Sequence, residues 1–203
     1  LQPEDEPFLA AVLANDRSKD VRQIAAALLS RLPASAFARR MIARLDSCIR
    51  SERKLFRAVT VIEPPTAFAP DWKSDAIEEL PAAEITLGAR AWWLRQMVSY
   101  APLHWWEEKL ALNPAAILAV AGKSEWKVAL LAGFRAALGQ QPGHPAWALA
   151  MLERDGFSHQ NATSLALTLD PATADAALQR ILAATDDAAL AAQIIESADF
   201  VWS

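Results

Sequence analysis

The stretch Asp16-Arg-Ser-Lys-Asp-Val-Arg-Gln-Ile-Ala-Ala-Ala-Leu-Leu-Ser-Arg-Leu32 decides the predicted fold. Its apolar side chains recur with the spacing of one helix face, which predicts a helix over 20–32. The preceding Phe8-Leu-Ala-Ala-Val-Leu13 predicts a shorter helix over 7–14. Two short helices joined by a turn form a hairpin that cannot bury its apolar faces without neighbours. The stretch therefore indicates a stack of helical hairpins.

Composition supports a helical core and argues against broad nucleic-acid binding. Hydrophobic residues make up 53% of the 203-residue chain, enough for a sizeable core. The net charge is −4, whereas proteins that bind nucleic acid widely usually have a basic surface. No apolar run approaches the roughly 18 residues of a membrane span. We expect a cytoplasmic protein that does not enter the membrane, and because the chain begins with Leu1 rather than Met we expect it to be a fragment or a processed form.

Prolines and capping residues predict where the helices begin. Proline fits the first helical turn, where its missing N–H is no loss. Asn113 and Asp170 directly precede such prolines and are predicted N-caps, and Ser124 is a predicted cap for the next helix. Helices are predicted over 7–14, 20–32, 35–50, 89–100, 102–112, 114–121, 125–138, 145–154, 161–169, 171–184 and 187–198.

Residues 51–88 interrupt this series and are predicted to be a long irregular insertion. The segment holds four prolines and shows no sustained helical period. Within it, the β-branched run Arg57–Ile62 is typical of a short extended segment, and 71–80 can form one or two helical turns. A connection this long is usually functional or mobile. We favour packing of Phe68 and Trp72 onto the helices, since disordered segments contain few aromatic residues.

The 16–32 stretch resembles the HEAT repeat consensus. Asp16 stands at the inter-helix turn, Val21 and Arg22 match its Val-Arg pair, and small and apolar residues follow in the expected order. The resemblance implies that the arginine reaches toward the acidic turn of a neighbouring repeat. The run 127–134 matches the repeat only in part.

The order of elements also resembles an uncharacterised bacterial family, a domain of unknown function built from HEAT-like repeats. The matching blocks are Asp16–Leu32, Gly88–Gln96 and Pro102–Trp106. Members of such families tend to accompany ATPases and adhesion-type domains in bacterial operons. The implied fold is an all-α, HEAT-like α-solenoid of about five hairpins, a single domain over 1–203 with the insertion at 51–88. The resemblance also implies that the chain is the C-terminal part of a longer protein.

Paired tryptophans are the first candidate site. Adjacent helical residues point about 100° apart, so Trp92-Trp93 and Trp105-Trp106 cannot each share one face. If the second member of each pair faces the core, Trp92 and Trp105 point sideways. They either pack against the next hairpin or serve as exposed anchors for a partner, with Arg95 beside them. We take Trp92, Arg95 and Trp105 as the candidate partner-binding residues.

A basic run is the second candidate site. Only Asp46 and Glu52 offset its positive charge. The run is either a solvated outer face or a patch for phosphate, nucleic acid or an acidic partner. Its members are Arg39, Arg40, Arg44, Arg50, Arg53, Lys54 and Arg57.

Catalytic and metal-binding patterns are absent from the sequence. The three histidines form no spaced cluster with cysteine, and no nucleophile or phosphate-loop signature is present. His104 and Glu108 lie one helical turn apart, which is typical of an exposed ion pair. The single cysteine, Cys48, is predicted to be a small buried apolar residue rather than a nucleophile. We expect no metal and no cofactor.

These observations favour a non-catalytic protein–protein interaction scaffold in a bacterial complex, whose partner the sequence does not identify. The alternative is a nucleic-acid-binding or DNA-repair protein of the HEAT-like glycosylase type, with the basic run facing the groove. A small-molecule enzyme has the least support. Solenoids present an extended concave surface to partners, and we expect binding there.

Overall fold

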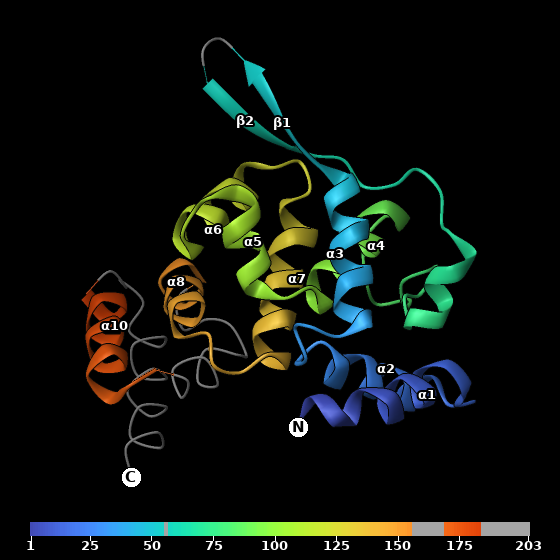
Figure 1. Ribbon diagram of the computed structural model, residues 1–203. Coiled ribbons are helices and arrows are strands. Elements are labelled where there is room, and N and C mark those ends of the chain that lie inside the picture. The colour runs from blue at the N-terminus through green and yellow to red at the C-terminus, as the bar shows by residue number, and fades with distance from the viewer. Residues whose placement is uncertain (55–56, 156–168, 184–203) are drawn as a thin grey trace. The chain divides into compact units, whose positions relative to one another are not determined.

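The computed structural model describes residues 1–54, 57–155 and 169–183, and the chain they form is mostly helical (Figure 1). The sequence predicts a single domain over 1–203, and the structure has two compact units within it. The first is Leu1–Gln141 and the second is Pro142–Ser203. Each is described by itself below.

The predicted first hairpin is present. After a 3-10 turn η1 (Pro3–Asp5), helices α1 (Glu6–Asn15) and α2 (Lys19–Leu29) pack against each other. In the turn between them, the Asp16 carboxylate accepts the Ser18 N–H at 2.8 Å. The Ser18 hydroxyl in turn caps α2 by accepting the Val21 N–H. The aspartate thus holds the turn, as the repeat pattern predicts.

Helix α3 (Ala36–Cys48) begins at the Ser35 cap and ends two residues before the predicted boundary. The chain then forms an antiparallel hairpin of β1 (Ile49–Lys54) and β2 (Arg57–Ile62), which extends away from the helices of its unit (Figure 1). The extended segment 57–62 is confirmed, whereas the strand that pairs with it over 49–54 was not predicted. The charged residues of β1 show no strand pattern in the sequence. This strand is stabilised by pairing with β2, which contains β-branched residues.

The rest of the connection packs onto the helices. A 3-10 helix, η2 (Pro70–Asp75), lies within the predicted helical turns and contacts α1. Trp72 is buried, and its ring meets Phe68 and Trp93 edge-on or tilted at centroid distances of 5.2–5.8 Å. The Trp93 indole N–H also donates to the Glu79 carbonyl at 2.8 Å. The expectation that Phe68 and Trp72 anchor this segment is confirmed.

Helix α4 (Ala89–Tyr100) forms the centre of the first unit. Eight of its residues are buried, including the polar Gln96 and Ser99, so most of its circumference packs against other parts of the unit. It packs on α3 and, most extensively, on α7 (Lys127–Gln140). A Cβ on Gly133 of α7 would lie 2.7 Å from Val98 Cβ and 2.9 Å from the Arg95 carbonyl oxygen. Only glycine permits so close an approach of the two helices.

Helices α5 (Leu103–Leu110) and α6 (Pro114–Lys123) complete the first unit and pack on α7 and on each other. The Asn113 side chain caps α6 by accepting the Ala116 N–H at 2.9 Å, as predicted. Ser124 accepts the Trp126 N–H just before α7 begins. Gln141 donates to the Ala101 carbonyl and accepts the Leu103 N–H, which ties the end of α7 to the start of α5.

In the second unit, α8 (Pro145–Asp155) packs against α10 (Pro171–Ala183). Asp170 caps α10 by accepting the Thr173 N–H at 3.0 Å. Hydrogen bonds with the side chain and the backbone of Thr173 lower the pKa of the Asp170 carboxyl. The helix predicted over 187–198, and almost all of the one over 161–169, lie outside the described residues.

Candidate functional site

The two sideways tryptophans are buried. Trp92 is 8% exposed and Trp105 is 9% exposed. The Trp105 ring packs edge-on against Trp106, which in turn packs on Phe134 of α7, with centroid distances of 5.0 Å in both pairs. This burial does not match the interpretation of Trp92 and Trp105 as exposed anchors. It matches the alternative, that they pack between helices.

Arg95 is the more accessible member of this predicted set. Its guanidinium lies 5.0 Å from the centre of the Trp92 ring, a cation–π contact. Burial lowers the pKa of Arg95, an effect that the nearby Tyr100 hydroxyl partly opposes. Within the described part of the chain Arg95 forms no ion pair. A half-buried cation stacked on an indole stabilises α4 locally, and its outer edge stays open to solvent.

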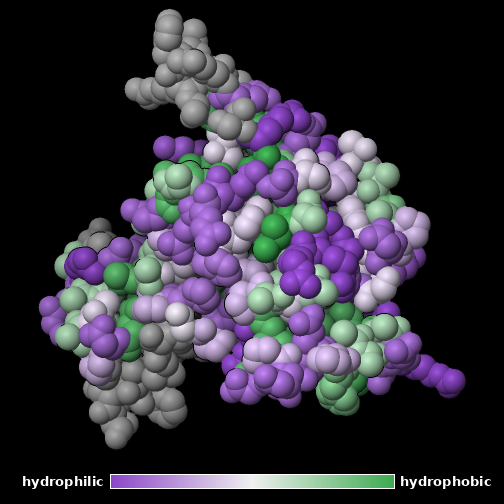
Figure 2. Space-filling model, viewed as in Figure 1, coloured by the Kyte–Doolittle hydropathy of each residue, from purple (hydrophilic) through white to green (hydrophobic). Residues whose placement is uncertain are grey.

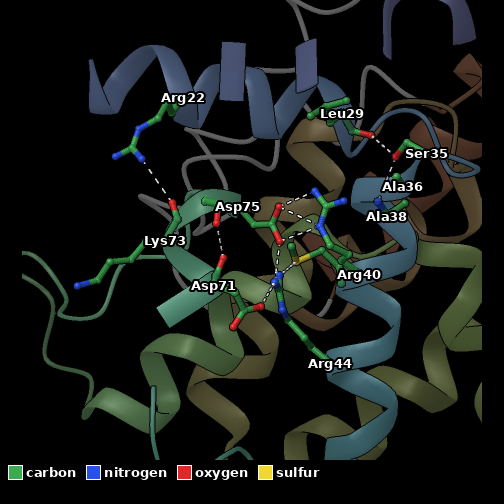
Figure 3. Close-up of polar contacts among 12 residues, drawn as sticks. Arg22, Leu29, Ser35, Ala36, Ala38, Arg40, Arg44, Asp71, Lys73 and Asp75 are labelled. Atoms are coloured by element: carbon green, nitrogen blue, oxygen red, sulfur yellow. Dashed lines mark hydrogen bonds and ion pairs between the residues drawn. The ribbon is translucent and has the colours of Figure 1, made fainter. Parts of the chain in front are cut away.

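Two arginines of the basic run, Arg40 and Arg44, are paired with acidic residues of the following connection. Asp75 on η2 is 3% exposed and receives hydrogen bonds from the Arg40 Nε and Nη2 atoms at 2.6–3.1 Å (Figure 3). Arg44, one turn further along α3, contacts Asp75 at 2.6 Å and Asp71 at 3.1 Å. Two guanidinium groups therefore face two carboxylates. We call these four residues the α3–η2 clasp.

The clasp lies at the meeting point of three elements of the first unit. A pocket of about 250 Å³ beside it is lined by Ala10, Leu13 and Ala14 of α1 and by clasp residues from α3 and η2. The hydrogen bond to Asp75 raises the pKa of Arg40. Arg22 of α2 also reaches η2, but it donates to the Lys73 carbonyl at 3.4 Å rather than to an acidic side chain (Figure 3). The arrangement is suited to holding η2 in place.

The other members of the basic run divide into two groups. Arg39 donates to the Ala34 carbonyl at 2.7 Å, and Arg50 pairs with Glu52 and Glu63 at 3.0 and 2.6 Å. Of Arg53, Lys54 and Arg57 only the backbone, on the two strands, is described. The structure therefore does not gather the described side chains of this run into one unpaired basic surface. Asp71 and Asp75, 27 to 35 residues along the chain from their partners, were not predicted.

A groove beside the β-hairpin was also not predicted. Its volume is about 700 Å³. We call it the hairpin groove. It lies between β2 and the C-terminal ends of α5 and α6, and it is lined by Val59, Thr60, Ile62, Lys109, Leu110, Leu112, Val120, Lys123 and Ser124.

The chain turn at Ala111 shapes one wall of the hairpin groove. Ala111 has φ 51°, the left-handed conformation, and it ends α5. This turn lets Leu110 and Leu112 line the same groove. No residue pattern in the sequence marks alanine for this conformation, which glycine or asparagine usually adopts.

Groups that carry catalysis or bind metal are sparse among the described residues. None of them form a cluster of three or more histidine, cysteine or acidic side chains that could hold a metal ion. Cys48 is buried, and this burial raises the pKa of its thiol. His104 is exposed near the start of α5. In the part of the chain that is described, no helix has the length and apolarity to span a membrane.

The comparisons with known proteins place the chain in a family defined by sequence. The whole chain, residues 1–203, matches the model of a family of unknown function. The protein belongs to this family, DUF5691. No curated protein and no solved structure matches the chain. Any proposal of function therefore depends on the described residues and their geometry.

Proposed function

We propose that this protein is a non-catalytic scaffold, built as a HEAT-like array, that binds protein partners in a bacterial cytoplasmic complex. The observation that carries this proposal is the order in which the helices of the first unit pack. In an α-solenoid each hairpin contacts the hairpins next to it. Arrays of this kind bind macromolecules through extended surfaces rather than through an enclosed pocket.

Several contacts between the helices are consistent with such an array. Packing joins α1 with α2, α3 with α4, and α6 with α7. Contacts of α2 with α3 and of α4 with α7 link one pair to the next. Helix α5 and the β-hairpin are additions to this plan. The Asp16 turn and the reach of Arg22 to a neighbouring element are consistent with the repeat resemblance.

The first hairpin leaves apolar side chains at its surface. Phe8 is 71% exposed and Ile24 is 61% exposed, on α1 and α2 respectively. Figure 2 shows hydrophobic surface among hydrophilic residues at the lower edge of the molecule, where these helices lie. Large apolar side chains exposed in this way favour contact with another protein surface.

The experiment is quantitative affinity capture from the native host, with the tagged full-length protein as bait and untagged protein as competitor. We expect at least one protein to be recovered in near-stoichiometric amount and to be displaced by the competitor. Cross-linking of the captured complex would then locate the contact surface. If no protein is recovered in a competable manner, the scaffold proposal is wrong.

The nucleic-acid alternative receives less support from the geometry. It needs the basic run to face a groove, and Arg40, Arg44 and Arg50 are paired with carboxylates. Arginines that are already paired with carboxylates neutralise few phosphates of a nucleic acid, so little affinity is gained from the release of counterions. We therefore keep the protein-binding function as the single proposal.

A further inference from the structure

We propose that the hairpin groove binds an extended acidic segment of a partner protein, which adds to the open edge of β2 as a third strand. This inference rests on the proposed scaffold function and names the surface and chemistry by which it binds. Three independent features support it, namely the free backbone groups of β2, the apolar lining of the groove, and its charge.

The backbone of β2 has free hydrogen-bonding groups along one edge. The Glu63 N–H donates to the Cys48 carbonyl at 2.8 Å, which makes residues 48 and 63 a hydrogen-bonded pair. In an antiparallel ladder such pairs alternate with pairs whose N–H and C=O groups point outward. From the register, Ile62 and Thr60 belong to the pairs whose N–H and C=O groups point outward. Among the described residues no third strand pairs with this edge of β2. Its outward N–H and C=O groups are therefore available to form hydrogen bonds with an added strand.

The groove runs along this same edge. Val59 and Thr60 are consecutive strand residues, so their side chains point to opposite faces of the sheet. Both line the hairpin groove, together with Ile62. A cavity that touches both faces of β2 reaches around the outer edge of this strand, and the adjoining pocket continues over one face of the hairpin to Ile49 of β1. A peptide in the groove would therefore meet the outward backbone groups of Thr60 and Ile62.

The lining offers apolar pockets for alternate side chains of an added strand. Leu110 and Leu112, on either side of the Ala111 turn, face β2 across the groove, and Val120 of α6 adds to the apolar wall. Strand addition commonly gains its affinity from main-chain hydrogen bonds and its specificity from such pockets.

Charge decides which kind of segment fits. Lys109 and Lys123 line the groove, and none of the described lining residues carries a carboxylate. Lys109 pairs with Asp46 at 2.5 Å, outside the lining. Lys123 is exposed and forms no ion pair with any residue in the described ranges. An acidic side chain of the bound segment would meet Lys123 without having to displace another carboxylate.

The experiment uses two displayed peptide libraries and the full chain. Both libraries hold segments of about six residues, the usual strand length, with apolar residues at alternate positions. One library fills the other positions with Asp and Glu, and the second fills them with Lys and Arg. We expect the protein to enrich the acidic library only. Anisotropy of the enriched peptides, labelled with a fluorophore, then gives the affinity for each variant.

Two variants separate strand addition from other modes of binding. Thr60→Pro removes an outward N–H from the edge that faces the groove. Ser51→Pro is its matched control, because it removes the outward N–H of the same rung on the opposite edge of the hairpin. We expect Thr60→Pro and Lys123→Glu each to weaken peptide binding by about tenfold or more. Ser51→Pro should bind as the unaltered protein does, and all three should retain its thermal midpoint.

Several results would overturn the inference. These are enrichment of the basic library, enrichment of neither library, or equal effects of the two proline variants. Binding of a fatty-acid anion such as oleate that needs Lys123 but not the Thr60 N–H would assign the groove to a small amphipathic ligand instead. If a partner captured from the host stays bound to both Thr60→Pro and Lys123→Glu, the scaffold function stands and the hairpin groove is not its binding surface.

Discussion

At the scale of single residues, Asp75 has the clearest structural role. Its carboxylate is almost fully buried and receives two guanidinium groups, from Arg40 and Arg44. A buried charge that loses its partner is far more costly than an exposed pair that breaks. The clasp therefore holds η2 against α3 through ion pairs that the sequence of neither segment indicates by itself.

We predict that Asp75→Asn lowers the free energy of unfolding by about 2–4 kcal/mol, because the mostly buried Arg44 then keeps only its ion pair with the exposed Asp71. The lower part of this range allows for Arg40, which is half exposed and screened by solvent. Urea denaturation measures the difference. Asp71→Asn is the matched control, since Asp71 is 69% exposed, and it should cost less than about 1 kcal/mol. Equal losses in the two variants would contradict this role for Asp75.

A second residue-scale prediction concerns Tyr100, the only tyrosine in the chain. Burial raises the pKa of its hydroxyl from 10.0 to about 12. Between these values the unfolded chain loses the proton first and so binds fewer protons than the folded chain. Stability should therefore fall as the pH rises from about 10 toward 12.

The measurement is the absorbance of the tyrosinate form as a function of pH, combined with thermal melts. Tyr100→Phe is the control, because it should remove both the absorbance change and this part of the loss of stability. A tyrosinate signal that titrates at the pKa of an exposed tyrosine while the protein stays folded would show that the hydroxyl is not buried.

At the scale of elements, the contact between α4 and α7 depends on one glycine. We predict that Gly133→Ala destabilises the protein by about 1–3 kcal/mol, because the new Cβ would press into Val98 and the Arg95 carbonyl. Gly139→Ala on the same helix is the matched control. Its Cβ would meet no atom within 4 Å, so removing a flexible glycine should stabilise the helix by about 0.5–1 kcal/mol. Thermal unfolding of both variants tests the pair, and effects of the same sign would refute the close approach.

The positions of most helices follow from the sequence because their ends depend on local chemistry. Proline in the first turn and a capping side chain specify a helix start from residues only a few positions apart, as Asn113 does for α6. Ser18 and Ser35 cap α2 and α3 by the same rule. The strand β1 could not be predicted in this way, because its charged residues show no pattern until β2 pairs with them.

The candidate sites could be predicted only where their contacts are local. The direction of Trp93 toward the core follows from helical spacing, whereas the burial of Trp92 depends on elements that pack beside it. The arginines of α3 resemble a basic patch because their carboxylate partners come 27 to 35 residues later. The hairpin groove combines three segments and an unusual left-handed alanine. Contacts of this kind depend on tertiary packing, which one sequence does not display.

At the scale of the whole molecule, the charge distribution leads to a prediction that separates the two functional classes. We predict that the full chain is not retained on heparin at low salt. Its net charge is −4, and the described arginines of the basic run are largely engaged by carboxylates or a carbonyl. The measurement is elution position across a salt gradient. Retention that persists well above physiological salt would revive the nucleic-acid alternative.

Glu63→Lys offers a positive control for that chromatography. It removes one of the two carboxylates that hold Arg50 and adds a cation beside it. The variant should interact with heparin more strongly than the unaltered chain, at low salt only. If neither protein binds heparin, the electrostatic potential of the surface is too weak to attract a polyanion.

The meeting of Trp72 and Trp93 gives the molecule a built-in optical signal. Their indoles lie 5.8 Å apart and nearly perpendicular, and Trp72 belongs to η2 whereas Trp93 belongs to α4. Rings this close share their excited states, so their circular dichroism and emission depend on the pairing itself. Detachment of η2 would change that spectrum while the helices remained intact. The loosening of one segment can thus be followed in unlabelled protein, separately from the melting of the rest.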